Sequence, residues 1–194
     1  MKYFAYAALP EDIGISRAKQ VMEARGYEWV QGISKQELQL AEEIWRLPNG
    51  RGAVRFIYDH FVEVPMIRAE SDIHGEPFNI LTDLASDFPV LHTSALTKQA
   101  TSSSLAETVY ALRALAASTE RYHGSVLKTF KAAIMDPDPA IRELILVCIG
   151  RYPAFAFAQD LQEQAAVESD PKIKEQQLAL ANDLLQHGRR GTLW

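Results

Sequence analysis

A five-residue pattern that occurs twice constrains the fold of this chain more than any other feature. Residues 138–142 (DPAIR) return 32 positions later as residues 170–174 (DPKIK). In both copies an Asp precedes a Pro, which favours a helix N-terminus because Asp accepts hydrogen bonds from the first backbone amides and Pro fits the first helical position. The same offset carried backwards reaches another apolar segment, at 106–117. A period in the low thirties, with two helices per unit, is the pattern of stacked helical repeats.

The second half of the chain is therefore predicted to be helical. The expected helices form two pairs and a closing helix, and they span 104–117, 123–135, 138–150, 155–168 and 171–187. Residues 135–142, with the apolar positions that follow them and Pro153, resemble a HEAT repeat, whose first helix follows Asp-Pro and carries a hydrophobic-Arg pair. The resemblance covers 104–188 and implies an α-α superhelix that recognises partners. Arg142 and Lys174 occupy equivalent positions, where we expect ion pairs with acids of neighbouring loops.

In such a stack the resemblance places the second helix of each pair on the concave, partner-facing surface. The polar residues expected there are Lys128, Lys131, Gln159, Asp160 and Glu163. Phe155 and Phe157 are two positions apart, so they cannot both lie at the centre of one buried stripe. We therefore add Phe155 as an exposed aromatic contact for a partner.

Residues 1–98 show a mixed pattern of strands and helices. The alternation of Val54, Phe56 and Tyr58 predicts a hairpin over 53–70, with Pro65 at the turn or on an edge. Strands are also expected at 3–9 and 90–91, and helices at 15–25, from Ser34 to Trp45, and at 77–87. This order resembles a βαββαβ plan. A hydroxyl-rich stretch at 93–104 indicates a connection, so we expect an α+β domain over 1–98, a helical HEAT-like repeat domain over 99–188 and a tail over 189–194.

Composition and charge exclude several classes of protein. The 194 residues are 47% hydrophobic and include one Cys, which rules out extensive disorder and a disulfide scaffold. The net charge of −5 divides into −4 for residues 1–98 and −1 for 99–194, so no basic cluster indicates nucleic-acid binding. Cys148 lies in an apolar helix and is expected in the core. The N-terminal apolar run is too short for a signal peptide, and we expect a cytoplasmic, bacterial protein without membrane contact or cofactor.

Three functional hypotheses remain, and the first is favoured because the sequence lacks the usual catalytic signatures. It is a protein-binding or adaptor module, without catalysis, that recognises another protein on its helical stack. The first alternative is an enzyme or cofactor-handling protein with a pocket at the domain junction, near Tyr58, His60 and His74. Asp59 cannot orient His60 in such a site, because successive strand residues point to opposite faces. The second alternative is an acidic inhibitor of a basic partner protein.

Overall fold

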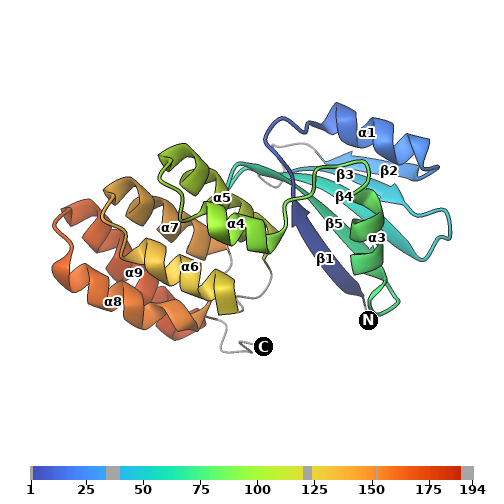
Figure 1. The fold of residues 1–194 in the computed structure, drawn as a ribbon. Helices are drawn as coiled ribbons and strands as arrows, with labels where there is room; N and C mark the ends of the chain where they lie inside the picture. Colours follow the sequence, from blue (N-terminus) through green and yellow to red (C-terminus); the bar gives the residue numbers. More distant parts are fainter. Residues whose placement is uncertain (1, 34–39, 120–123, 152, 189–194) are drawn as a thin grey trace. The chain divides into compact units, whose positions relative to one another are not determined.

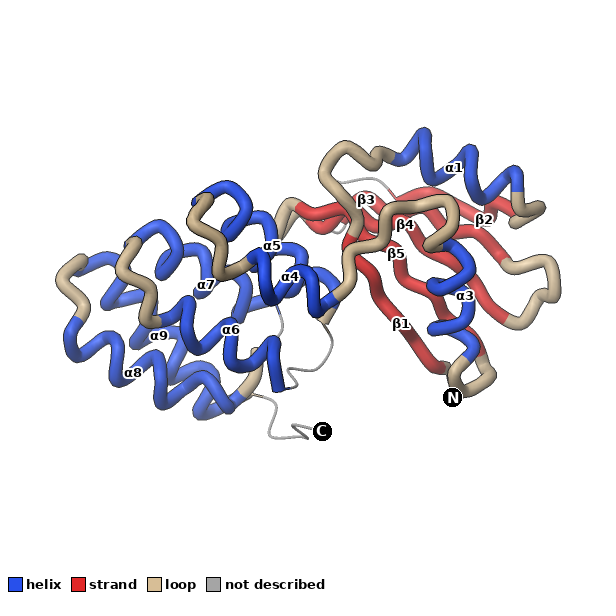
Figure 2. The backbone as a smooth tube through the Cα atoms, in the orientation of Figure 1, coloured by secondary structure: helices blue, strands red, loops and turns tan. Residues whose placement is uncertain are grey.

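The chain forms an α+β part followed by a helical part, as expected. The computed structural model describes residues 2–33, 40–119, 124–151 and 153–188. Two compact units, Met1–His92 and Thr93–Trp194, have separate internal packing (Figures 1 and 2). The expected boundary at residue 98 falls inside α4 (Thr93–Gln99). No helix in the described part of the chain has the length and apolarity needed to cross a membrane.

Unit 1 is built on an antiparallel sheet with the strand order β1-β5-β4-β3-β2. The strands are β1 (Tyr3–Ala8), β2 (Glu28–Ile33), β3 (Leu40–Arg46), β4 (Gly52–Asp59) and β5 (Val64–Ser71). Neighbouring strands pair along nearly their whole lengths, with an irregular register in β2 between Trp29 and Gln31. Within the described residues, β1 and β2 are therefore the two edges of this sheet.

Among the described residues, two helices cover one face of the sheet, α1 (Ile15–Ala24) and α3 (Glu76–Leu84). Helix α3 packs on β1 and β5, and α1 reaches β2. Their apolar residues form a single core with the inward-facing residues of the strands, among them Ala18, Met22, Trp45, Val54, Phe56, Ile67 and Leu84. Arg25 ties the two helices together, because its Nε donates to Asp87 at 2.7 Å and its Nη2 donates to the Asp83 carbonyl at 2.8 Å.

The predicted elements of unit 1 hold except around β2 and β3. The hairpin, the first strand and the helices at 15–25 and 77–87 are confirmed, and Pro65 lies beside the hairpin turn but in an interior strand. The predicted helix from Ser34 to Trp45 is wrong over 40–46, which form β3; Ser34 and Glu37 lie outside the described residues. The observed order is β1-α1-β2-β3-β4-β5-α3, which replaces the βαββαβ plan. Residues 90–91 contribute only a single bridge, from Leu91 to Ala8.

Unit 2 contains six α-helices within the described residues. They are α4 (Thr93–Gln99), α5 (Leu105–Ser118), α6 (Gly124–Ile134), α7 (Pro139–Arg151), α8 (Ala158–Val167) and α9 (Pro171–His187), with a 3-10 turn at Phe155–Phe157. Asp138 and Asp170 both accept hydrogen bonds from amides of the helices that they precede, so the predicted caps are confirmed. Helices α5, α7 and α9 pack side by side in one layer, and α4, α6 and α8 in another.

The helix pairs differ from the predicted ones. Consecutive helices pack most closely as α4 with α5, α6 with α7, and α8 with α9. The prediction instead paired α5 with α6 and α7 with α8, and left α9 as a closing helix. The difference arises from α4, which lies inside the expected connection at 93–104. Its Leu96 is fully buried, so this segment packs as a helix. Because α4 pairs with α5, each later pair is shifted by one helix.

Candidate functional site

The residues expected on the partner-facing helices mostly contact one another. Lys131 Nζ of α6 lies 2.8 Å from Asp160 Oδ2 of α8, and Gln159 donates to Glu163 at 2.8 Å. Lys128 is exposed. Phe157 is fully buried and Phe155 is exposed, as the spacing predicts. The Lys131–Asp160 pair joins α6 to α8, the Gln159–Glu163 contact lies within α8, and both leave fewer groups available for a partner.

The three residues of the expected junction pocket do not share one site. Tyr58 and His60 lie together, with ring centroids 4.7 Å apart, where β5 begins at its hairpin with β4. His74 follows the other end of β5 and packs edge-on against Tyr3 at 5.0 Å. A strand of this length separates its two ends by about 20 Å. His74 therefore cannot line a pocket with the other two rings.

A network of charges lies on the sheet face opposite α1 and α3, which we call the arginine face after Arg46, Arg55 and Arg68. Arg55, in the central strand β4, donates to Glu42 of β3 at 2.8 Å and to Glu70 of β5 at 3.1 Å. The partners come from flanking strands because residues directly across an antiparallel pair, and their diagonal neighbours, point to the same face.

Glu70 is the most heavily engaged carboxylate of the arginine face. Besides Arg55 it accepts a hydrogen bond from Arg68 at 3.0 Å, and Lys2 lies 3.7 Å away. Burial alone would raise the pKa of Glu70, but the hydrogen bonds from Arg55 and the charges of Arg55, Arg68 and Lys2 leave the pKa below its ordinary value. Arg68 also stacks on the Phe4 ring at 4.3 Å. Three cations thus surround one carboxylate.

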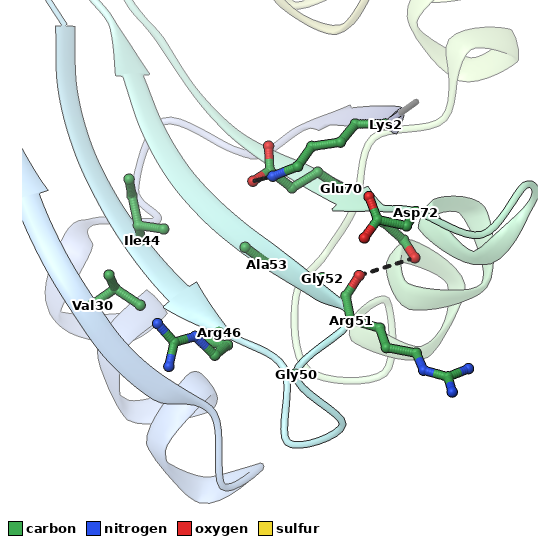
Figure 3. Close-up of a pocket in the computed structure, with 11 residues that line it drawn as sticks. Lys2, Val30, Ile44, Arg46, Gly50, Arg51, Gly52, Ala53, Glu70 and Asp72 are labelled. Atoms are coloured by element: carbon green, nitrogen blue, oxygen red, sulfur yellow. Dashed lines mark hydrogen bonds and ion pairs between the residues drawn. The ribbon is translucent and has the colours of Figure 1, made fainter.

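A groove of about 300 Å³ crosses the sheet on the arginine face (Figure 3). Its apolar floor is formed by Ile44 and Ala53. Lys2, Glu70 and Asp72 lie at one end, and Val30 and Arg46 lie at the other. The groove therefore joins an apolar surface to cations at both ends.

Two glycines shape the turn that closes the groove between β3 and β4. Gly50 has a positive φ of 68°, a conformation that side chains with a Cβ disfavour. At position 52 a Cβ would collide with the Glu70 carbonyl oxygen, so only glycine lets β4 lie this close to β5. The guanidinium of Arg51, in the same turn, points away from the groove in Figure 3.

The edge strand β2 borders the groove and exposes large apolar side chains. Trp29 is 54% exposed and Val30 is 40% exposed. Trp29 is held in place, because its Nε1 donates to Glu43 at 2.5 Å. Gly32 makes room for this contact, since a Cβ there would lie 2.5 Å from the Glu43 carboxylate. Natural edge strands are often protected by Lys or Pro. The sequence of β2 has neither residue, but it includes Glu28 and a register irregularity.

Net charge is distributed unevenly between the two units. Residues 1–92 carry 9 Lys and Arg against 14 Asp and Glu, whereas residues 93–194 carry 11 of each. The whole net charge of −5 therefore belongs to unit 1. The arginine face follows this trend, with four cations (Lys2, Arg46, Arg55, Arg68) and five carboxylates (Glu28, Glu42, Asp59, Glu70, Asp72).

Sequence reasoning missed this site because it depends on β2 and β3. With residues 40–46 interpreted as a helix, Glu42 and Arg46 could not be placed beside Arg55. One signal in the sequence could have indicated the site: each strand of the correctly predicted hairpin carries an arginine, Arg55 on one and Arg68 on the other. Across the described ranges, no group of three or more His, Cys, Asp or Glu side chains could hold a metal ion.

The fold and the site define an α+β unit, with a charged sheet face and an exposed edge strand, joined to a helical unit. Comparisons of the chain with protein-family models, curated proteins and solved structures found no match. The expected membership of the HEAT-repeat family is therefore corrected, since no family model supports it. The two Asp-Pro sequences that suggested the resemblance cap the helices that follow them. Caps of this kind begin many helices and do not indicate a particular family.

Proposed function

We propose that this protein is a binding module for other proteins and that β2 is its contact strand. The observation that carries the proposal is the exposure of Trp29 and Val30 on a strand that pairs only with β3 among the described residues. An extended segment of a partner can add to such an edge through main-chain hydrogen bonds, while side-chain pockets give specificity.

The side-chain contacts of β2 support this proposal. Trp is among the residues that contribute most binding energy at protein interfaces. The hydrogen bond from Trp29 to Glu43 fixes the indole in the free protein, so less conformational entropy is lost when a partner covers it. The exposed part of the ring then offers a preformed apolar surface.

The enzyme alternative has no comparable support. Its three residues lie at opposite ends of β5, as described above. The central charges of the arginine face form ion pairs with one another, from Arg55 to Glu42 and Glu70 and from Arg68 to Glu70, which is the usual arrangement of a structural cluster rather than of a general acid or base.

The proposal is tested by selecting binders from a random-peptide display library against the full chain, followed by affinity measurements with synthetic peptides. Trp29→Lys should weaken binding by about tenfold or more, the loss typical of a central aromatic contact. Phe78→Lys is the matched control, because Phe78 is 65% exposed on α3 of the same unit. Equal losses for the two variants, or a library that yields no binder, would contradict the proposal.

A further inference from the structure

We infer that the groove of the arginine face binds an elongated organic anion with carboxylates at both ends. This inference goes beyond protein binding at β2 and depends on different residues, those that line the groove. The first supporting observation is shape: about 300 Å³ of space lies over an apolar floor of Ile44 and Ala53, and binding sites for small ligands are commonly of this size and largely apolar.

The second supporting observation is charge at each end of that floor. Lys2 is 60% exposed, and its distance of 3.7 Å from Glu70 is longer than the 3.0–3.3 Å hydrogen bonds that Arg55 and Arg68 give the same carboxylate. Glu70 therefore keeps two cationic partners when Lys2 turns to an incoming anion. At the other end Arg46 pairs with Glu28 at 3.3 Å, and both side chains are exposed.

An acidic side chain lies near each of the two cations, Lys2 and Arg46, and lowers the affinity of the groove for an anion. Asp72 is exposed at the Lys2 end of the groove, and Glu28 competes for Arg46 at the other. A single carboxylate gains little against either competitor, since exposed ion pairs contribute only about 0–1 kcal/mol. A molecule with two carboxylates engages both cations while its aliphatic chain covers Ile44 and Ala53, so we assign the groove to dicarboxylates.

The test compares three probes of equal chain length, adipate, hexanoate and hexanamide, by following backbone amide signals of Ile44 and Ala53 in the labelled full-length protein. Adipate should bind most tightly and hexanamide most weakly. A blocked Glu-Gly-Gly-Glu peptide separates the two sources of this chemistry: tighter binding of the peptide indicates an acidic protein segment, and tighter binding of adipate indicates a free dicarboxylate. Hexanamide binding as well as adipate would overturn the inference.

Variants locate the site and separate it from β2. Lys2→Ala should weaken adipate binding by about fivefold, the limit for an exposed ion pair, and Asp72→Asn should strengthen it. Lys19→Ala is the matched control, because Lys19 is 62% exposed and lies 3.8 Å from Glu23. Trp29→Lys should leave adipate binding unchanged even though it weakens the binding of the library-selected peptides. Equal effects of Lys2→Ala and Lys19→Ala would reject the groove as the binding site.

Discussion

Burial of the Gln177 side chain lowers the stability of unit 2. Gln177 lies in α9, its side chain is fully buried, and neither its amide nitrogen nor its amide oxygen has a hydrogen-bond partner among the described residues. A buried polar group without a partner loses its hydration without compensation. The amide of Gln177 therefore opposes folding, while its apolar carbons contribute to packing.

Replacing Gln177 by Leu should stabilise the protein. The change removes the unsatisfied amide and keeps a similar volume, so the free energy of unfolding should rise by about 1–2 kcal/mol in denaturant titrations. Gln176→Leu is the control, because Gln176 is the exposed neighbour on the same helix, and it should change that free energy by less than about 0.5 kcal/mol. A loss of stability in Gln177→Leu would show that the amide has a partner.

The burial of Cys148 in the core was predicted correctly from its neighbours in the sequence. The thiol is fully buried in α7, and burial raises the pKa of the Cys148 thiol to about 12. The apolar residues on both sides of Cys148 along the helix predict this position without any knowledge of neighbouring helices.

At the scale of elements, one buried ion pair holds α7 to the segment that precedes α9. Arg142 donates to both carboxylate oxygens of Glu168, at 2.6 and 2.9 Å, and also donates to the carbonyls of Asp136 and Pro137. The hydrogen bond from Arg142 lowers the pKa of Glu168 to about 2, although burial acts in the opposite direction. The expected pairing of Arg142 with an acid of a neighbouring loop is therefore confirmed.

This pKa predicts how the stability of the protein depends on pH. A carboxyl whose pKa falls from 4.5 in the unfolded chain to about 2 in the folded protein stabilises the fold above pH 4.5. That contribution, about 3 kcal/mol, is lost as the pH falls from about 4.5 to about 2. In denaturant titrations, the stability difference between the natural protein and Glu168→Gln should therefore shrink over this range.

An exposed ion pair between α7 and α9 provides the comparison. Lys172 of α9 lies 2.6 Å from Glu143 of α7, and both side chains are largely exposed. Glu143→Gln should change the free energy of unfolding by less than about 1 kcal/mol at neutral pH. A stability difference for Glu168→Gln that stays constant from pH 7 to pH 2 would contradict the assigned role of the pair.

The elements could be predicted from the sequence where local signals decided them. Asp138 and Asp170 mark helix starts through contacts within one turn, and the alternation from Val54 to Tyr58 marks a strand. Residues 40–46 were predicted as part of a helix because the sequence has a capping-box pattern at Ser34 and Glu37 and apolar residues at helical spacing up to Trp45, a local preference for helix. Pairing with β4 outweighs this preference, since it buries Trp45 on one face and Ile44 on the other.

The candidate site could not be predicted because it is assembled from residues far apart in the chain. Lys2, Arg46 and Glu70 meet only when β1, β5, β4 and β3 lie in that order, and no local pattern specifies the order of strands. The HEAT-repeat resemblance failed for the opposite reason. It relied on a local cap signal that many helices share.

At the scale of the whole molecule, the two units differ in charge and in the kind of surface that they offer. Unit 1 carries the entire net charge of −5, and its arginine face combines four cations with five carboxylates. In unit 2, Lys131 of α6 pairs with Asp160 of α8, and Gln159 pairs with Glu163 within α8. We therefore expect recognition to depend on unit 1.

The most direct test of this account is to map a selected peptide on the labelled full-length protein by its effect on backbone amide signals. We expect the largest changes at Glu28–Ile33, with protection of β2 amides from hydrogen exchange when the peptide adds as a further strand. Changes confined to α6 and α8, with β2 unaffected, would contradict the assignment of β2 as the contact strand.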